Sequence, residues 1–110
     1  MDMQVERKEW QFFADSFSEE NYGRPITIES ITQARGDEFL AEKMPLLALD
    51  FDIKGVGVAM ITVGEGTETF THTLNAPEAV WFERLASGKM VAMEIVVTGG
   101  DKLIIKFDDM

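Results

Sequence analysis

The sequence predicts an α+β fold: one N-terminal amphipathic helix, then about seven short strands in a curled, mostly antiparallel meander that forms a half-closed barrel. Three observations support this fold. Apolar residues recur with the period of a helix before Pro25 and with the period of a strand after it. Turn residues separate the alternating runs. Every connection after Lys54 is short, which favours antiparallel neighbours because parallel strands need long crossovers.

The predicted helix spans about residues 6–20. One of its faces carries apolar side chains at positions i, i+3, i+4 and i+7, namely Trp10, Phe13, Ala14 and Phe17. Gly23 takes the left-handed conformation that ends helices at low steric cost. Aromatic faces of this kind are most often buried, so we expect the helix to cover the open side of the sheet. The alternative is an aromatic groove that binds a partner.

The alternating runs after the helix predict strands, at about residues 26–34, 42–54, 57–63, 69–75, 79–85, 90–98 and 102–107. The second run is long, and it places Asp50 and Asp52 on the face opposite Leu49 and Phe51. Proline cannot donate to a ladder, so Pro45 must lie at the start of this strand or on a sheet edge. An incompletely closed sheet leaves edges that pair with something, and the 42–54 strand is the expected dimer edge.

Length, charge and cysteine content limit the functional classes. A chain of 110 residues is predicted to be a single domain, residues 1–110. It has no cysteine, which excludes disulfides and thiolate metal sites. Its formal net charge of −10 repels nucleic-acid phosphates and anionic membranes, so we expect neither as a partner. No segment resembles a signal peptide or a membrane span of roughly 20 apolar residues, and we expect a cytoplasmic protein.

His72 is the one histidine of the chain, in phase with Phe70 and Leu74 on the apolar face of its strand. We expect a half-buried imidazole that is held by a hydrogen-bond partner. The alternatives are a pH sensor or a general base, because imidazole titrates near pH ~6.5. A lone histidine without cysteine does not make a zinc site, and no phosphate loop or nucleophile elbow is present. The sequence therefore predicts no cofactor, metal or catalytic residue, and it argues against an enzyme.

Paired carboxylates are the remaining chemical signal. Asp50 and Asp52 point to the same side of their strand, about 7 Å apart along the chain. With Glu83 and Glu94 on later strands they would supply a glycosidase pair or a calcium cluster. The simpler interpretation is a solvated outer face. Trp81 shares a face with Glu83, and we expect an exposed aromatic ring beside an acid.

Three motifs in order resemble a known family. They are EW-x-FF-x-x-FS at Glu9–Ser18, Ile-Thr-Ile-Glu at 26–29, and THTL-x-x-P at Thr71–Pro77. This order is similar to that of a family of short bacterial proteins classed only as a domain of unknown function. The resemblance covers most of the chain, supports the predicted fold and implies a bacterial cytoplasmic setting. It implies no known activity, cofactor or catalytic residue.

These observations together favour a non-enzymatic small domain that acts through protein–protein or self association, with an unidentified protein or a second copy as its partner. The alternative is small-molecule binding in an apolar cavity between the helix and the curled sheet. Enzymatic use of His72 with a carboxylate, and acidic mimicry of nucleic acid, are weaker alternatives. The candidate ligand or partner residues are His72, Trp81, Trp10, Asp50, Asp52 and Glu83.

Overall fold

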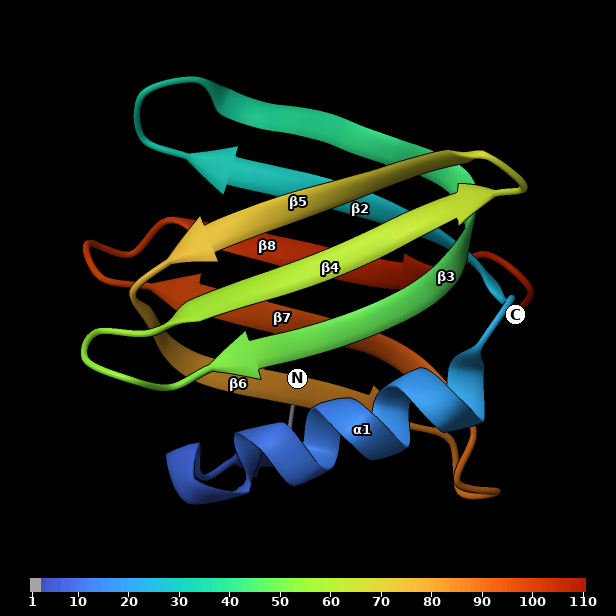
Figure 1. Ribbon diagram of the computed structural model, residues 1–110, viewed down its shortest axis with the longest axis horizontal. Coiled ribbons are helices and arrows are strands. Elements are labelled where there is room, and N and C mark those ends of the chain that lie inside the picture. The colour runs from blue at the N-terminus through green and yellow to red at the C-terminus, as the bar shows by residue number, and fades with distance from the viewer. Residues whose placement is uncertain (1–2) are drawn as a thin grey trace.

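The strands form an eight-stranded antiparallel sheet in the computed structural model, which describes residues 3–110 (Figure 1). The order across the sheet is β1-β6-β7-β8-β2-β3-β4-β5. The strands are β1 (Met3–Val5), β2 (Pro25–Thr32), β3 (Gly36–Asp52), β4 (Val58–Glu65), β5 (Glu68–Asn75), β6 (Pro77–Arg84), β7 (Met90–Val97) and β8 (Lys102–Phe107). A 3-10 turn, η1 (Arg7–Glu9), leads directly into the helix α1 (Trp10–Asn21).

The α+β class, with one N-terminal helix and an antiparallel sheet, is confirmed. The prediction of a half-closed barrel is wrong, because the sheet is neither closed nor strongly curled and both β1 and β5 are edges. The seven predicted strands correspond to β2–β8, but the prediction that they form one continuous meander is wrong. β1 precedes the helix and pairs with β6, and the last strand, β8, inserts between β7 and β2. In addition, β3 begins at Gly36 rather than near residue 42.

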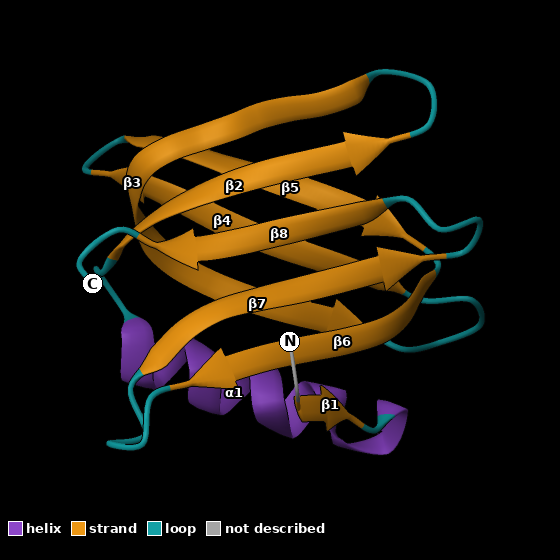
Figure 2. Ribbon diagram, turned by 180° about the vertical axis from the view of Figure 1, so that it is seen from behind, coloured by secondary structure: helices purple, strands orange, loops and turns teal. Residues whose placement is uncertain are grey.

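Strand β3 joins the two parts of the sheet. Its residues 36–45 pair with β2, and its residues 46–52 pair with β4. Between these stretches Lys43 takes a positive φ of 53°, and the register with β4 slips between Leu46 and Ala48. The strand changes direction at this point. As a result β3, β4 and β5 lie across β2, β8 and β7, and the two groups face each other as layers (Figures 1 and 2).

The core lies between these layers. Ile61 and Val63 of β4, Ile95 of β7 and Ile105 of β8 are all exposed by no more than 1%. Helix α1 closes one side of the two layers, as Figure 1 shows below β3 and β6. Burial of several large apolar side chains from each layer, at roughly 1.5–3 kcal/mol each, supplies the main driving force for the fold.

The aromatic face of α1 belongs to this core. Trp10, Ala14 and Phe17 are buried, and the Trp10 ring lies 5.2 Å from the Phe51 ring of β3. The Trp10 Nε1–H donates to the Val5 carbonyl oxygen at 2.9 Å, so the polar atom of the indole is also satisfied. Phe12 points away from this face and is 72% exposed. The covering role expected of the helix is therefore observed for the Trp10 stripe and not for Phe12.

Helix α1 also covers one edge of β3. The Ser18 hydroxyl oxygen accepts a hydrogen bond from the Leu49 N–H at 2.8 Å and lies 2.7 Å from the Ala14 carbonyl oxygen, to which it donates. Because β4 pairs with the other side of this stretch, Leu49 is covered on both edges of the strand. The expected dimer edge along 42–54 is thus covered at Leu49 by α1. Periodicity identifies this helix but does not predict that it lies against β3. Dimer formation stays a prediction.

We predict that Ser18→Ala lowers the free energy of unfolding by about 1–3 kcal/mol, because it leaves the Leu49 N–H without its acceptor. Ser16→Ala is the matched control on the same helix, since it changes helix propensity equally. Urea unfolding followed by circular dichroism measures both. Equal stability of the two variants would contradict this role of Ser18.

Candidate functional site

An open groove lies between the first part of β3 and the edge strand β5. Figure 1 shows these parts of the two strands on the side of the layers away from α1. Its volume is about 340 Å³. It is lined by Leu40, Ala41, Glu42 and Met44 of β3 and by Phe70 and His72 of β5. We refer to these six residues as the open groove.

The groove exists because the layer that contains β5 extends past the edge of the layer that faces it. Residues of β5 lie directly opposite buried residues of β4 and share their inward face: Phe70 opposite Val63, His72 opposite Ile61, and Leu74 opposite Ala59. The β4 residues are exposed by no more than 1%, whereas Phe70 is 54% exposed. Phe70 therefore lacks the cover that the opposite layer gives to β4, whereas His72 is half-buried and Leu74 packs against the core.

Both strands that border the groove have an unpaired edge. Within the described residues 3–110, β5 pairs only with β4, and residues 36–45 of β3 pair only with β2. Unpaired backbone N–H and C=O groups on such edges are templates for another strand. Exposed apolar side chains accompany them, with Leu40 39% and Phe70 54% exposed. An apolar surface with free strand edges on both sides is suited to binding an extended chain.

His72 is half-buried in the groove wall, as the sequence predicts, but its Nε2 atom is buried without a hydrogen-bond partner among residues 3–110. The expected partner is thus absent from this part of the chain. Desolvation lowers the pKa of the imidazole below its ordinary value of 6.5, so the ring is neutral at neutral pH. An unpartnered buried polar atom costs about 1–3 kcal/mol, which a hydrogen-bonding group bound in the groove would offset.

Asp50 and Asp52 lie on the exposed outer side of β3, where backbone N–H groups satisfy them. The Phe51 N–H donates to Asp50 Oδ1 at 3.0 Å, and the Lys54 N–H donates to Asp52 Oδ1 at 3.1 Å. Asp50 also lines a depression of about 600 Å³ between β3 and α1. No group of three potential metal ligands occurs within residues 3–110.

Glu83 and Trp81 lie on β6 and not with these aspartates. Trp81 is half-buried opposite Glu94 of β7, and Glu94 meets Lys102 at 3.2 Å. The four carboxylates proposed from the sequence as a glycosidase pair or calcium cluster are therefore divided between the two layers. The reason is the change of direction in β3, which separates the strand of the aspartates from β6 and β7. His72 and Trp81 are likewise apart, because Trp81 alternates with the inward-facing Val80 and Phe82.

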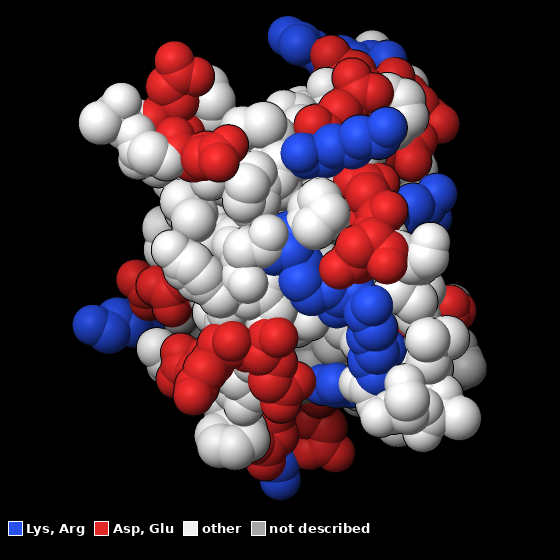
Figure 3. Space-filling view, turned by 90° about the vertical axis from the view of Figure 1, so that its right-hand side faces the viewer, with Lys and Arg blue, Asp and Glu red and all other residues white. Residues whose placement is uncertain are grey.

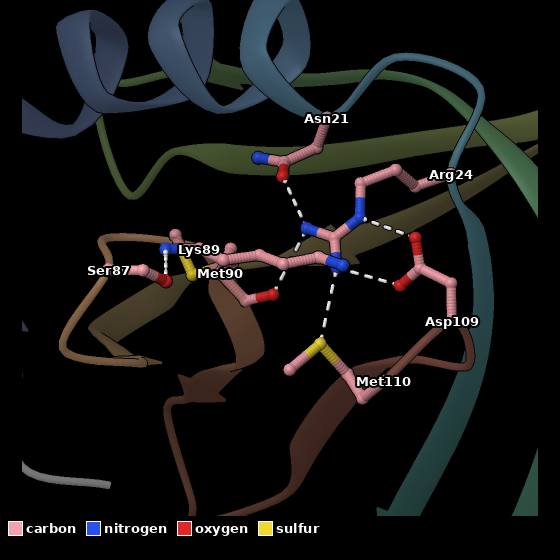
Figure 4. Close-up of polar contacts among 7 residues, drawn as sticks. All are labelled: Asn21, Arg24, Ser87, Lys89, Met90, Asp109 and Met110. Carbon is pink, nitrogen blue, oxygen red and sulfur yellow. Dashed lines mark hydrogen bonds and ion pairs between the residues drawn. The ribbon is translucent and has the colours of Figure 1, made fainter.

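A cluster around Arg24 was not predicted from the sequence (Figure 4). Its guanidinium donates to both carboxylate oxygens of Asp109, at 2.9 and 2.7 Å, to Asn21 Oδ1 at 2.7 Å and to the Met90 carbonyl oxygen at 3.0 Å. The guanidinium also lies 3.9 Å from the centre of the Phe107 ring. These contacts tie the end of α1 to β7 and to the end of the chain. The side chain is engaged in holding the fold and has little capacity left for a ligand.

Charge is unevenly distributed over the surface. Figure 3 shows a band of Lys and Arg side chains with acidic side chains on both sides of it and uncharged surface beside it. Acids outnumber bases over the whole chain, 20 to 10. Cationic and neutral partners are therefore favoured over anionic ones.

Comparison with known proteins assigns the chain to a family of unknown function. A family model described as "Family of unknown function (DUF5335)" matches residues 1–110. An uncharacterized protein of Aquifex aeolicus (strain VF5) is 24% identical over 102 residues, which cover 93% of this chain and 87% of that protein. No solved structure matches this chain. Within residues 3–110, no helix is long and apolar enough to cross a membrane.

We predict that His72 makes stability fall with acidification near its ordinary pKa of 6.5. Because burial lowers the pKa of His72 in the folded state, the unfolded chain binds the proton first. Stability is then complete above pH 6.5 and declines as pH falls from 6.5 toward the folded-state pKa. Thermal melts between pH 8 and pH 5 should show a steeper decline for the native protein than for His72→Gln. Parallel curves would contradict the burial of the imidazole.

We predict a second acid-sensitive contact at Asp109. Hydrogen bonds from Arg24 lower the pKa of Asp109 below its ordinary value of 3.8, so the stabilisation is complete above pH 3.8 and is lost as pH falls further. Asp109→Asn should cost about 1 kcal/mol at pH 7 and weaken the acid dependence below pH 4. The control is Asp37→Asn on the exposed start of β3. Urea unfolding at several pH values measures both, and equal effects would exclude a specific Arg24–Asp109 contribution.

Proposed function

We propose that this chain, which belongs to the family of unknown function DUF5335, is an interaction domain that binds an extended segment of a partner protein in the open groove. One observation carries this proposal: Phe70, an inward-facing side chain of β5, is 54% exposed, while Val63, which lies opposite it on β4, is buried. A bound strand would supply the missing cover.

The free edge of β3 sets how such a segment binds. A strand that pairs with residues 36–44 extends the β2 side of the sheet by about 4.8 Å, and so lies over the inward face of β5. Its backbone satisfies the unpaired N–H and C=O groups of β3. Every second side chain points inward, where Phe70 and Leu40 offer apolar contacts. An inward polar group is placed to bond His72 Nε2.

Charge selects the partner. Glu42 lines the groove, and Asp37, Glu38 and Glu68 lie on the two bordering strands. Arg35 meets Glu38 at 3.7 Å and Lys43 lies next to Glu42 on β3, so two bases offset part of the charge of these four acids. A second copy of the chain brings a further charge of −10, which opposes self association. A segment that alternates apolar residues with lysine or arginine satisfies both the apolar floor and the acidic border.

A cavity beneath the helix has less support. The space between α1 and the layers is filled by Trp10, Phe17 and Phe51, each exposed by no more than 1%. The Phe17 ring lies 5.8 Å from the Phe107 ring of β8, so helix and sheet are in direct contact. A small molecule would have to bind outside this core.

The test is selection of peptides from a phage-displayed library of random 12-mers on the immobilised protein. We predict enrichment of peptides that alternate apolar and basic residues. Phe70→Glu should weaken their binding about fivefold or more, because loss of a central apolar contact costs over about 1 kcal/mol. Val56→Glu is the matched control, since Val56 is 74% exposed but lies in the turn between β3 and β4, away from the groove.

A second variant, Leu40→Glu, tests the opposite wall of the groove, and melting curves check that each variant folds. Peptides that bind both groove variants as tightly as the native protein would overturn the proposal. So would amide chemical-shift changes confined to residues outside β3 and β5. A dimer in sedimentation equilibrium that Phe70→Glu dissociates would identify a second copy as the occupant of the groove.

A further inference from the structure

A second groove lies between α1, β1 and β6, far from the open groove in the order of the sheet. Its volume is about 480 Å³, within the range of roughly 300–1,000 Å³ that is typical of small-molecule sites. The residues that matter here are Met3, Glu9, Phe12, Phe13, Phe82 and Arg84. We call this the aromatic groove.

Its floor is built from aromatic rings fixed by the core. Phe13 of α1 lies 5.3 Å from Phe82 of β6 and 5.8 Å from Phe17, ring centre to ring centre. Phe17 is fully buried, so this stack has a rigid base. Phe12 is 72% exposed and Met3 is 55% exposed at the border. The apolar surface is therefore preformed and accessible.

Its border is acidic. Glu6, Glu9 and Glu20 line the groove, and Arg84 is the one cation among its lining residues. Arg84 is committed to the Gly88 carbonyl oxygen at 2.8 Å and to Glu20 at 3.5 Å. Glu9 makes no ion pair within residues 3–110. A free carboxylate thus stands beside exposed aromatic rings.

The groove already shows that an aromatic face here accepts a cation. The Arg84 guanidinium carbon lies 5.4 Å from the centre of the Phe82 ring, at the distance of a cation–π contact. Aromatic faces together with carboxylates are the groups that recognise organic ammonium ions. A bound strand is a poorer fit, because β1 has only 3 residues and its Val5 carbonyl oxygen is taken by Trp10.

We propose that the aromatic groove binds a small organic cation with an apolar body, of the alkylammonium class. The alkyl chain lies on Phe12 and Phe82, and the ammonium group lies at Glu9. This site is independent of the peptide-binding function proposed for the open groove, and failure of either leaves the other standing.

Three probes of equal chain length separate charge from apolarity: octylamine, octanol and octanoate, each below its aggregation concentration. We expect octylamine to give saturable amide chemical-shift changes in residues 3–20 and 80–84, with octanol weaker and octanoate weakest. Raised salt should weaken the binding of octylamine and leave the binding of octanol unchanged. Equal binding of octylamine and octanoate would overturn the proposal, as would no saturable binding or shifts in another region.

Variants locate the site. Glu9→Gln should weaken the binding of octylamine roughly two- to fivefold, which is the contribution of one exposed ion pair, and leave the binding of octanol unchanged. Phe12→Ser should weaken both probes, and its exposed position leaves the fold intact. Glu65→Gln, on an exposed acid at the end of β4, is the matched control for loss of one negative charge. If Glu65→Gln weakens octylamine as much as Glu9→Gln, the attraction belongs to the whole molecule and the proposed site is wrong.

Discussion

Strand β3 is the element on which the structure depends, because it pairs with a different neighbour along each of its halves. A strand that kept one direction through Lys43 and Pro45 would carry β4 and β5 on in the plane of β2 and leave one face of the sheet without cover. The left-handed Lys43, the missing N–H of Pro45 and the slipped register after Leu46 turn the strand instead. The two faces then bury each other, and α1 fills the side that remains.

The same turn determines where the molecule is incomplete. Residues 46–52 no longer pair with β2, so one edge of this stretch is free to contact α1. Ser18 of α1 accepts a hydrogen bond from the Leu49 N–H there. Residues 36–45 pair with β2 but not with β4, and nothing in residues 3–110 pairs with their second edge. One change of direction thus creates two edges. The chain covers one with a helix and leaves the other beside the uncovered Phe70.

The sequence carries the local structure well and the long-range pairing poorly. The Trp10 stripe and the alternation in β7 and β8 are periodic signals, and each depends only on near neighbours in the chain. β1 has 3 residues, too few to show a period, and its strand character comes from pairing with β6. Residues 36–41 contain charged and apolar side chains without alternation, because this stretch is exposed on an edge. The same limit applies to His72 as a candidate site residue. Alternation with Phe70 and Leu74 predicts which face of the strand it lies on, but its place in an open groove depends on where β3 turns.

The acidity of the chain bears on both of the surfaces that this fold leaves open. Two apolar surfaces remain open, and free strand edges border one of them, which is the arrangement that leads proteins to aggregate. Carboxylates stand at both: Glu42 in the open groove, and Glu9 with its neighbours at the aromatic groove. Since every copy carries the same charge of −10, these carboxylates oppose pairing between copies and favour ligands of opposite sign. The charge that opposes pairing between copies would therefore also give each proposed binding site its preference for cations.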